Sequence, residues 1–212
     1  MTRIIIIISL LVFQNTVLFS QEGWALTKDS EEIKVYTKAE EGYAFKTFKG
    51  TTVINASIHD FVYTLLDLNK YPDWGHNVKS ARKLDRKGDT LQVYYSIAKA
   101  PFPYKNRDGI YRNRFDWNPE KNILLVSIEV LDDYIEEDEK YIRVKGNGYW
   151  KAEVLSNNKL NVTFLMQVDP GGTVPSWLAN MFVEDTPFNT LAGLKIVVEE
   201  NKEKNSNYNF ID

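Results

Sequence analysis

Residues 168–182 read VDPGGTVPSWLANMF and join an apolar segment to a long segment rich in aromatic residues. The Pro-Gly-Gly at 170–172 favours a turn, because Pro presets one backbone angle and Gly tolerates a positive φ. Pro175 suits the first turn of a helix, where its missing N–H costs nothing. We therefore expect a strand that ends near Val168 and a helix that begins near Pro175. We interpret this junction as part of a grip around a small apolar ligand.

The predicted final helix extends from about Pro175 to Glu200. Pro187 should kink or restart it, because Pro lacks a backbone donor and clashes with the preceding turn. The large apolar side chains expected on one side of this helix are Leu178, Met181, Phe182, Phe188, Leu191 and Leu194.

The rest of the chain reads mainly as strands. One helix is expected from Ile58 to Leu68, where apolar residues recur at helical spacing. A run of hairpins follows and predicts an α+β fold with a mostly antiparallel sheet. The last strand alternates apolar and polar residues from Leu160 to Val168, so one of its faces should line an interior. The predicted strands are 33–37, 44–54, 78–84, 90–97, 108–116, 122–130, 140–154 and 159–168.

This order of elements, together with four motifs, resembles the START domain family of lipid-transfer modules. The resemblance implies a helix-grip fold, in which a curved antiparallel sheet wraps around a long C-terminal helix and encloses an internal apolar cavity. The motifs are YPDW at 71–74, PFPYKNRDGIYR at 101–112, GNGYW at 146–150 and VDPGGTVPSWLAN at 168–180.

The resemblance also suggests which residues surround the ligand. The loop from Lys99 to Asn106 corresponds to a lid, and Phe102 and Pro103 are expected to help close the entrance. The predicted cavity residues are Tyr95, Tyr111, Asn113, Val126, Ile128, Val144, Phe164, Met166, Leu178, Met181, Phe182, Phe188 and Leu191.

Four polar residues fall at positions that are marked in the family: two match its pattern and two depart from it. Arg107 and Asp108 match an Arg-Asp pair, which we interpret as a structural brace at a strand entrance because no catalytic partner accompanies it. Some sterol-binding relatives place an acidic and a basic residue deep in the cavity; those positions fall here on Tyr95 and Asn113, so the charged pair is absent. Both side chains can donate and accept a hydrogen bond to one ligand oxygen. The alternative is a core Tyr with a satisfied hydroxyl.

The first twenty residues have the pattern of a secretory signal peptide, with Arg3 before an apolar run at 4–13. We expect cleavage after Ser20, a START-like domain over 21–200 and a flexible polar tail over 201–212. An uncleaved anchor is the alternative. The sequence contains no Cys, which excludes disulfides. The expected protein is an exported, bacterial-type member of the family, periplasmic or secreted.

The inferred inward strand positions are almost all apolar, which favours binding over catalysis. The net charge is −3, which provides no global field to attract nucleic acid. The two histidines, His59 and His76, have no metal-ligand spacing, so neither a metal nor another cofactor is expected. We predict a monomer that binds a hydrophobic small molecule, lipid or sterol-like, and makes transient contact with membranes.

Other functions stay open at this point. A small-molecule cyclase or hydrolase on the same fold would need Tyr95, Tyr111 or Asn113 to converge on a substrate. A carrier of the lipocalin type conflicts with the long final helix. An interaction module without a cavity is compatible with the fold, because a fold does not fix a function.

Overall fold

A computed structural model describes residues 23–156, 158–175, 178, 181–200 and 207–211. Within these residues, ten strands form one sheet in the order β1-β2-β3-β10-β9-β7-β6-β5-β4, and β8 pairs with β6. Neighbours along the main path are antiparallel, whereas β8 and β6 are parallel. The strands are β1 (Ala25–Ser30), β2 (Ile33–Lys38), β3 (Thr47–Ile54), β4 (Val78–Lys87), β5 (Leu91–Ala98), β6 (Arg107–Asn118), β7 (Ile123–Val130), β8 (Ile142–Arg143), β9 (Lys145–Ser156) and β10 (Lys159–Asp169).

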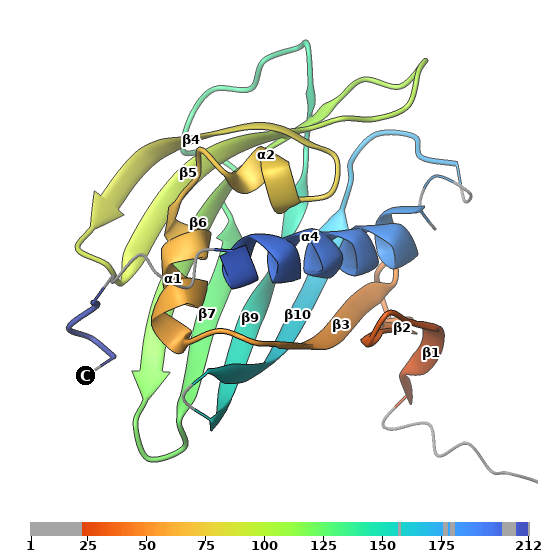
Figure 1. Cartoon of the computed structure of the whole chain (residues 1–212). Coiled ribbons are helices and arrows are strands. Elements are labelled where there is room, and N and C mark those ends of the chain that lie inside the picture. The colour runs from red at the N-terminus through yellow and green to blue at the C-terminus, as the bar shows by residue number, and fades with distance from the viewer. Residues whose placement is uncertain (1–22, 157, 176–177, 179–180, 201–206, 212) are drawn as a thin grey trace, which may run out of the picture.

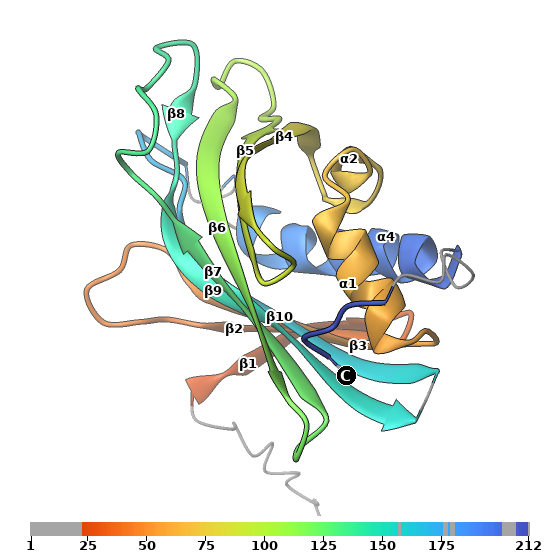
Figure 2. The ribbon, with the colours of Figure 1, turned by 90° about the vertical axis from the view of Figure 1, so that its left-hand side faces the viewer.

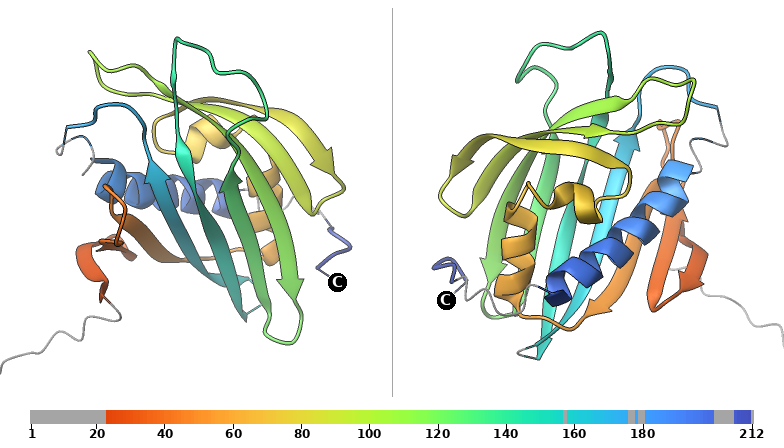
Figure 3. Two further views of the ribbon diagram at one scale, coloured as in Figure 1. Left: turned by 180° about the vertical axis from the view of Figure 1, so that it is seen from behind. Right: turned by 45° about the horizontal axis from the view of Figure 1, so that its top comes forward.

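The helices lie on the concave side of this sheet. They are α1 (Ile58–Leu66), the short α2 (Tyr71–Trp74), the π-helical turn η2 (Met181–Asp185) and the long α4 (Thr186–Glu200). The sheet curves around α4, and no helix covers its convex side in the described part of the chain (Figures 1, 2 and 3). The predicted α+β fold, a curved antiparallel sheet around a C-terminal helix, is confirmed. None of the helices described is long and apolar enough to cross a membrane.

Local sequence explains most element boundaries. Ser57 and Asp60 form a capping box at the start of α1, which satisfies backbone donors at the helix terminus. The predicted turn after β10 is confirmed, because Gly171 and Gly172 have φ values of 67° and 64°. Pro187 lies in the first turn of α4, directly after η2, so the helix restarts there instead of bending around the ring.

Three details differ from the sequence-based expectation. β1 was not expected, and its exposed, partly charged residues explain why the pattern is weak. α2 was not expected either; Pro72 is tolerated there because it lies in the first turn of the helix. The single strand predicted over 140–154 is divided into β8 and β9, because β8 pairs with β6 whereas β9 pairs with β7 and β10.

Two glycines allow α4 to lie close to its neighbours. A Cβ atom on Gly193 of α4 would lie 2.7 Å from the Trp74 carbonyl oxygen, so α2 can approach only because that atom is absent. On the sheet side, a Cβ atom on Gly50 would lie 2.6 Å from Leu191 Cδ1. Because neither glycine has a Cβ atom, α4 can lie close to both α2 and β3.

An aromatic stack forms the centre of the core. The Trp150 and Phe164 rings are parallel, with centroids 3.9 Å apart. Phe48 packs edge-on against Phe164, and Phe61 and Trp74 pack edge-on against Trp150. This stack joins β3, β9 and β10 to α1 and α2.

The end of the chain differs from the flexible polar tail predicted over 201–212. Tyr208 and Ile211 are buried, and Phe210 packs edge-on against Phe115 of β6. The Tyr208 ring also stacks on His59 of α1. Three apolar side chains in a polar segment are enough to bring residues 207–211 back onto the core; residues 201–206 and 212 lie outside the described part.

Candidate functional site

A pocket of about 140 Å³, called here the outer chamber, lies between the sheet, η2, the start of α4 and the segment that follows α2. Its walls are mainly apolar and include Phe45, Phe48, Val168 and Val183. The exposed side chain of Lys46 also lines it and marks where the chamber meets solvent.

A second pocket of about 40 Å³, the inner chamber, lies deeper in the domain. Tyr71, Tyr111, Phe164 and Met166 line both chambers, so the two spaces are neighbours. Trp74 and Trp150 from the aromatic stack complete the apolar part of the inner wall.

Uncharged polar groups gather on the inner wall. Tyr94 forms side-chain hydrogen bonds with Tyr71 and Asn113, and its ring stacks on Tyr111 with centroids 5.2 Å apart. Burial raises the pKa of Tyr71 to about 12 and raises the pKa values of Tyr94 and Tyr111 as well. These phenols therefore keep their protons at neutral pH and act as hydrogen-bonding groups, not as bases.

Two buried polar atoms on the inner wall lack a hydrogen-bond partner among the described residues. They are Trp74 Nε1, a donor, and Asn113 Oδ1, an acceptor. Such atoms carry a desolvation cost until something pairs with them. The inner chamber can therefore accept a group that both donates and accepts, such as a hydroxyl or a water molecule.

The structure places six of the predicted cavity residues on the chamber walls: Tyr111, Asn113, Ile128, Val144, Phe164 and Met166. Four others, Val126, Leu178, Phe188 and Leu191, are buried in the core and line neither chamber, because they pack against neighbouring side chains. The side chains of Met181 and Phe182 lie outside the described part of the structure.

The prediction that Tyr95 lines the cavity is wrong. The register pairs Tyr94 with Tyr111 and Gln92 with Asn113, so Tyr94 points to the chambers and Tyr95 to the opposite face. There the Tyr95 hydroxyl donates to Asp108 Oδ2 at 3.1 Å, and Arg82 stacks over its ring. The sequence-based assignment of side chains to the two faces of β5 was therefore shifted by one residue.

Phe102 and Pro103 do not close the entrance in this structure. Neither residue lines the outer chamber, and Phe102 is 97% exposed. The loop folds onto itself, with the Ala100 N–H donating to Asn106, and Lys105 reaches across to the Glu139 carbonyl. These bonds hold the loop away from the chamber mouth.

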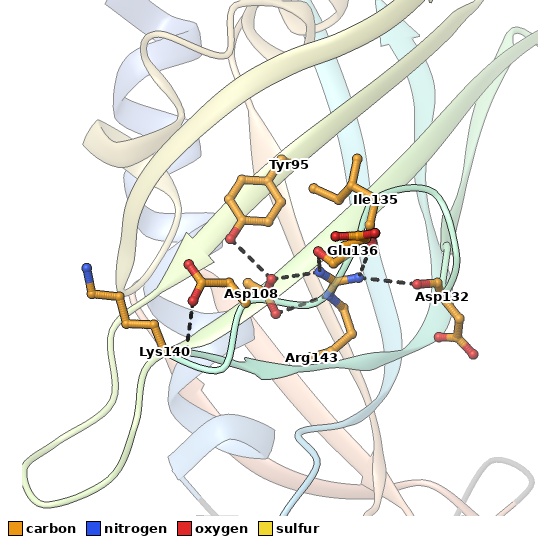
Figure 4. A network of polar contacts seen from close by, with 8 residues as sticks. Tyr95, Asp108, Asp132, Ile135, Glu136, Lys140 and Arg143 are labelled. Carbon is orange, nitrogen blue, oxygen red and sulfur yellow. Dashed lines mark hydrogen bonds and ion pairs between the residues drawn. The ribbon is translucent and has the colours of Figure 1, made fainter.

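The Arg-Asp pair separates into two different sites. Asp108 lies on the outer side of β6 and accepts hydrogen bonds from Arg143 Nε at 3.1 Å and Nη2 at 2.9 Å. Both side chains are almost fully buried (Figure 4). Arg143 also donates to the carbonyls of Asp132, Ile135 and Glu136 and so ties the acidic β7–β8 segment to the sheet. Asp108 therefore braces the fold through Arg143, not through Arg107.

Arg107 points to the other face and lines the outer chamber. It is 3% exposed, and its guanidinium donates to the carbonyl oxygens of Pro170 and Lys105. Burial lowers its pKa from the usual value, yet an Arg stays charged at neutral pH. The expectation of a purely structural role for Arg107 overlooked this position on the chamber wall.

Comparison with known proteins identifies the family. Residues 9–204 match the START domain family. The chain belongs to this family. A START-domain structure of a STAR-related lipid transfer protein from Xanthomonas axonopodis matches with a TM-score of 0.77 and 35% sequence identity, covering 84% of this chain and 99% of that one.

Two relatives of this START domain extend the comparison. A Pseudomonas aeruginosa protein of uncharacterised function is 31% identical over 180 residues, which is 84% of this chain and 88% of the relative. Bovine phosphatidylcholine transfer protein is 26% identical over 166 residues, which is 76% of this chain and 77% of the relative. The family and the helix-grip fold predicted from the motifs are confirmed.

Sequence reasoning missed several wall residues of this START domain, notably Tyr71, Trp74 and Tyr94. Tyr71 and Trp74 lie in the YPDW motif, which indicated the family but did not predict where these side chains point. Tyr94 and Tyr95 are adjacent aromatic residues, and the buried Gln92 removes the alternation that would distinguish their faces. The pairing partner Tyr111 was the available signal, because cross-strand neighbours share a face.

Proposed function

We propose that this START domain binds a hydrophobic small molecule, a lipid or a sterol-like compound, and carries it through water. The observation that supports this most is the apolar outer chamber between α4 and the sheet, continued by the inner chamber with its uncharged polar wall. Burial of apolar ligand surface there yields about 25 cal/mol per Å² without any charged contact. The lipid-transfer proteins named among its relatives support the same class of ligand.

The chamber volumes indicate that the ligand enters by opening the domain. A cavity of about 150 Å³ holds a molecule the size of benzene, and the outer chamber has a similar volume of about 140 Å³. A whole phospholipid or sterol is much larger. Phe45 of the β2–β3 loop and Val183 and Thr186 around the start of α4 line the chamber, so movement of these segments would enlarge it.

The test uses Ala98, a small residue on the outer wall. Ala98→Phe should fill the chamber and lower the affinity for a copurifying or added lipid by about tenfold or more, by removing the space for roughly two methylene groups. The measurement is lipid titration followed by tryptophan fluorescence, since Trp74 and Trp150 line the inner chamber.

Ile97→Phe is the matched control, because Ile97 precedes Ala98 on the same strand, is also half-buried and lines neither chamber. It should bind like the unmodified protein. Equal affinities of both variants and the unmodified protein would show that the ligand does not occupy this chamber. Solvent extraction of protein purified without detergent then identifies the class of any bound molecule.

The setting of this function is a further part of the proposal. The signal-peptide pattern at 1–20 supports export to the periplasm or the outside of the cell, and determination of the mature N-terminus tests it. We also propose a monomer that touches membranes transiently, which the exposed Phe102 ring supports. Sedimentation with phosphatidylcholine vesicles at several protein concentrations tests both points; a stable dimer or no vesicle-bound fraction would contradict them.

A further inference from the structure

Arg107 is a buried cation without an anionic partner among the described residues. It is 3% exposed, and the protein atoms that its guanidinium contacts through hydrogen bonds are the carbonyl oxygens of Pro170, at 3.3 Å from Nε, and Lys105, at 2.7 Å from Nη1. No carboxylate forms an ion pair with it in that part of the chain. Burial of an unpaired charge costs free energy, and groups of this kind are normally paired.

The neighbouring charges do not remove this imbalance. Asp108 follows Arg107 in the chain, but it points to the other face and is already engaged by Arg143 and Tyr95. Among the described residues, the buried charged side chains are therefore two guanidinium groups, Arg107 and Arg143, and one carboxylate, Asp108. The excess positive charge lies on the chamber side of β6.

The charged side chains on the chamber walls are also positive. Lys46 and Arg107 line the outer chamber, and neither chamber has an Asp or Glu on its wall among the described residues. His76 also lines the outer chamber, but burial lowers its pKa, which favours the neutral ring. The other residues of the outer wall are uncharged and mainly apolar, among them Phe48, Phe164 and Met166, and the inner wall carries no charged side chain among the described residues.

We propose that Arg107 binds the anionic end of an amphiphilic ligand, a carboxylate or a phosphate, while the apolar part of the ligand lies along Phe164 and Met166. This inference rests on the proposed function and narrows its ligand class. A guanidinium suits both anions, because its N–H groups form paired, charge-assisted hydrogen bonds with their oxygens. The pairing would supply the negative charge that the chamber wall lacks.

The test compares three ligands with the same alkyl chain: octanoate, octyl phosphate and octanol. Titration followed by tryptophan fluorescence should show that the preferred anion binds about tenfold to a hundredfold more tightly than octanol, the range for hydrogen bonds to a charged group. The two anions distinguish a carboxylate from a phosphate ligand. Octanol binding as tight as that of both anions would overturn the inference and leave the proposed function standing, whereas no binding of any of the three would contradict the proposed function itself.

Variants at position 107 assign the effect to this residue. Arg107→Met should remove the preference for the anion over octanol, and Arg107→Lys should retain only part of it, because Lys keeps the charge but loses the paired hydrogen bonds of the guanidinium. Arg112→Met is the control, since Arg112 lies on the same strand but pairs with Glu129 at the surface. Retention of the full preference in Arg107→Met would contradict the assignment.

Two control measurements accompany this test. Circular dichroism shows whether Arg107→Met folds; if it does not, Arg107→Lys decides, because an anion preference equal to that of the unmodified protein would contradict the assignment. Inorganic phosphate added as a competitor shows whether the alkyl chain contributes. Displacement of octanoate by phosphate at equal concentration would contradict an amphiphile, because the anion alone would then account for the affinity.

Discussion

Asp108→Ala is expected to lower the free energy of unfolding by about 3–5 kcal/mol, the usual cost of removing one partner of a buried ion pair. Asp108 and Arg143 have side chains that are 2% and 3% exposed, so water cannot replace the lost contact. The variant also leaves the Tyr95 hydroxyl without its acceptor. Chemical denaturation followed by circular dichroism measures the change.

A double variant separates the charge effect from simple loss of packing. Asp108→Leu combined with Arg143→Met removes both charges and should be more stable than Asp108→Ala, because no unpaired guanidinium remains. Glu129→Ala is the surface control: it breaks the partly exposed pair with Arg112 and should cost about 0–1 kcal/mol. A double variant less stable than Asp108→Ala would show that the carbonyl contacts of Arg143, and not its charge pairing, stabilise this region.

Trp150→Ala is expected to cost about 3–5 kcal/mol, the range for truncation of a large buried aromatic residue. Trp150 is 4% exposed and stacks on Phe164 at 3.9 Å, with Phe61 and Trp74 against its edges. Because Trp150 lines the inner chamber, the space left by the indole should join that chamber. The variant should therefore also bind a small aromatic molecule such as indole, which partly restores its melting temperature.

Trp24→Ala is the control for this prediction. Trp24 is half-buried before β1, where the Lys49 ammonium lies 4.5 Å from its ring centroid. Its loss should cost about 1 kcal/mol, and indole should have no effect on its melting temperature. If indole stabilises both variants equally, it binds elsewhere and the link between Trp150 and the inner chamber is wrong.

The sequence predicted the architecture because its main signals are local. Alternation in 159–168, the Pro-Gly-Gly turn and the apolar spacing of the final helix each depend on a few adjacent residues, and the structure has the corresponding elements. Four motifs in the right order then indicated the family. Six wall residues were also predicted, because strands with regular alternation place their side chains predictably.

The remaining errors concern properties that local patterns do not contain. Tyr95 was assigned to the wrong face because adjacent tyrosines leave the register of β5 undetermined until its pairing with β6 is known. Phe102 was assigned to the entrance, but a hydrogen bond within the loop, from Ala100 to Asn106, and one from Lys105 to the distant Glu139 carbonyl determine where that loop lies. Arg107 and Asp108 were treated as one pair, although consecutive strand residues point to opposite faces.

Because residues 207–211 pack against the core, labels at opposite ends of the domain can report two different events. These residues lie against α1 and β6, at the opposite end of the molecule from the β2–β3 loop and the start of α4 (Figures 1 and 3). A fluorophore attached beside Tyr208 would report assembly of the core, whereas one on Lys46 would respond to loading of the chamber. Kinetic traces from the two labels would therefore show whether a ligand arrives at a finished protein or takes part in its folding.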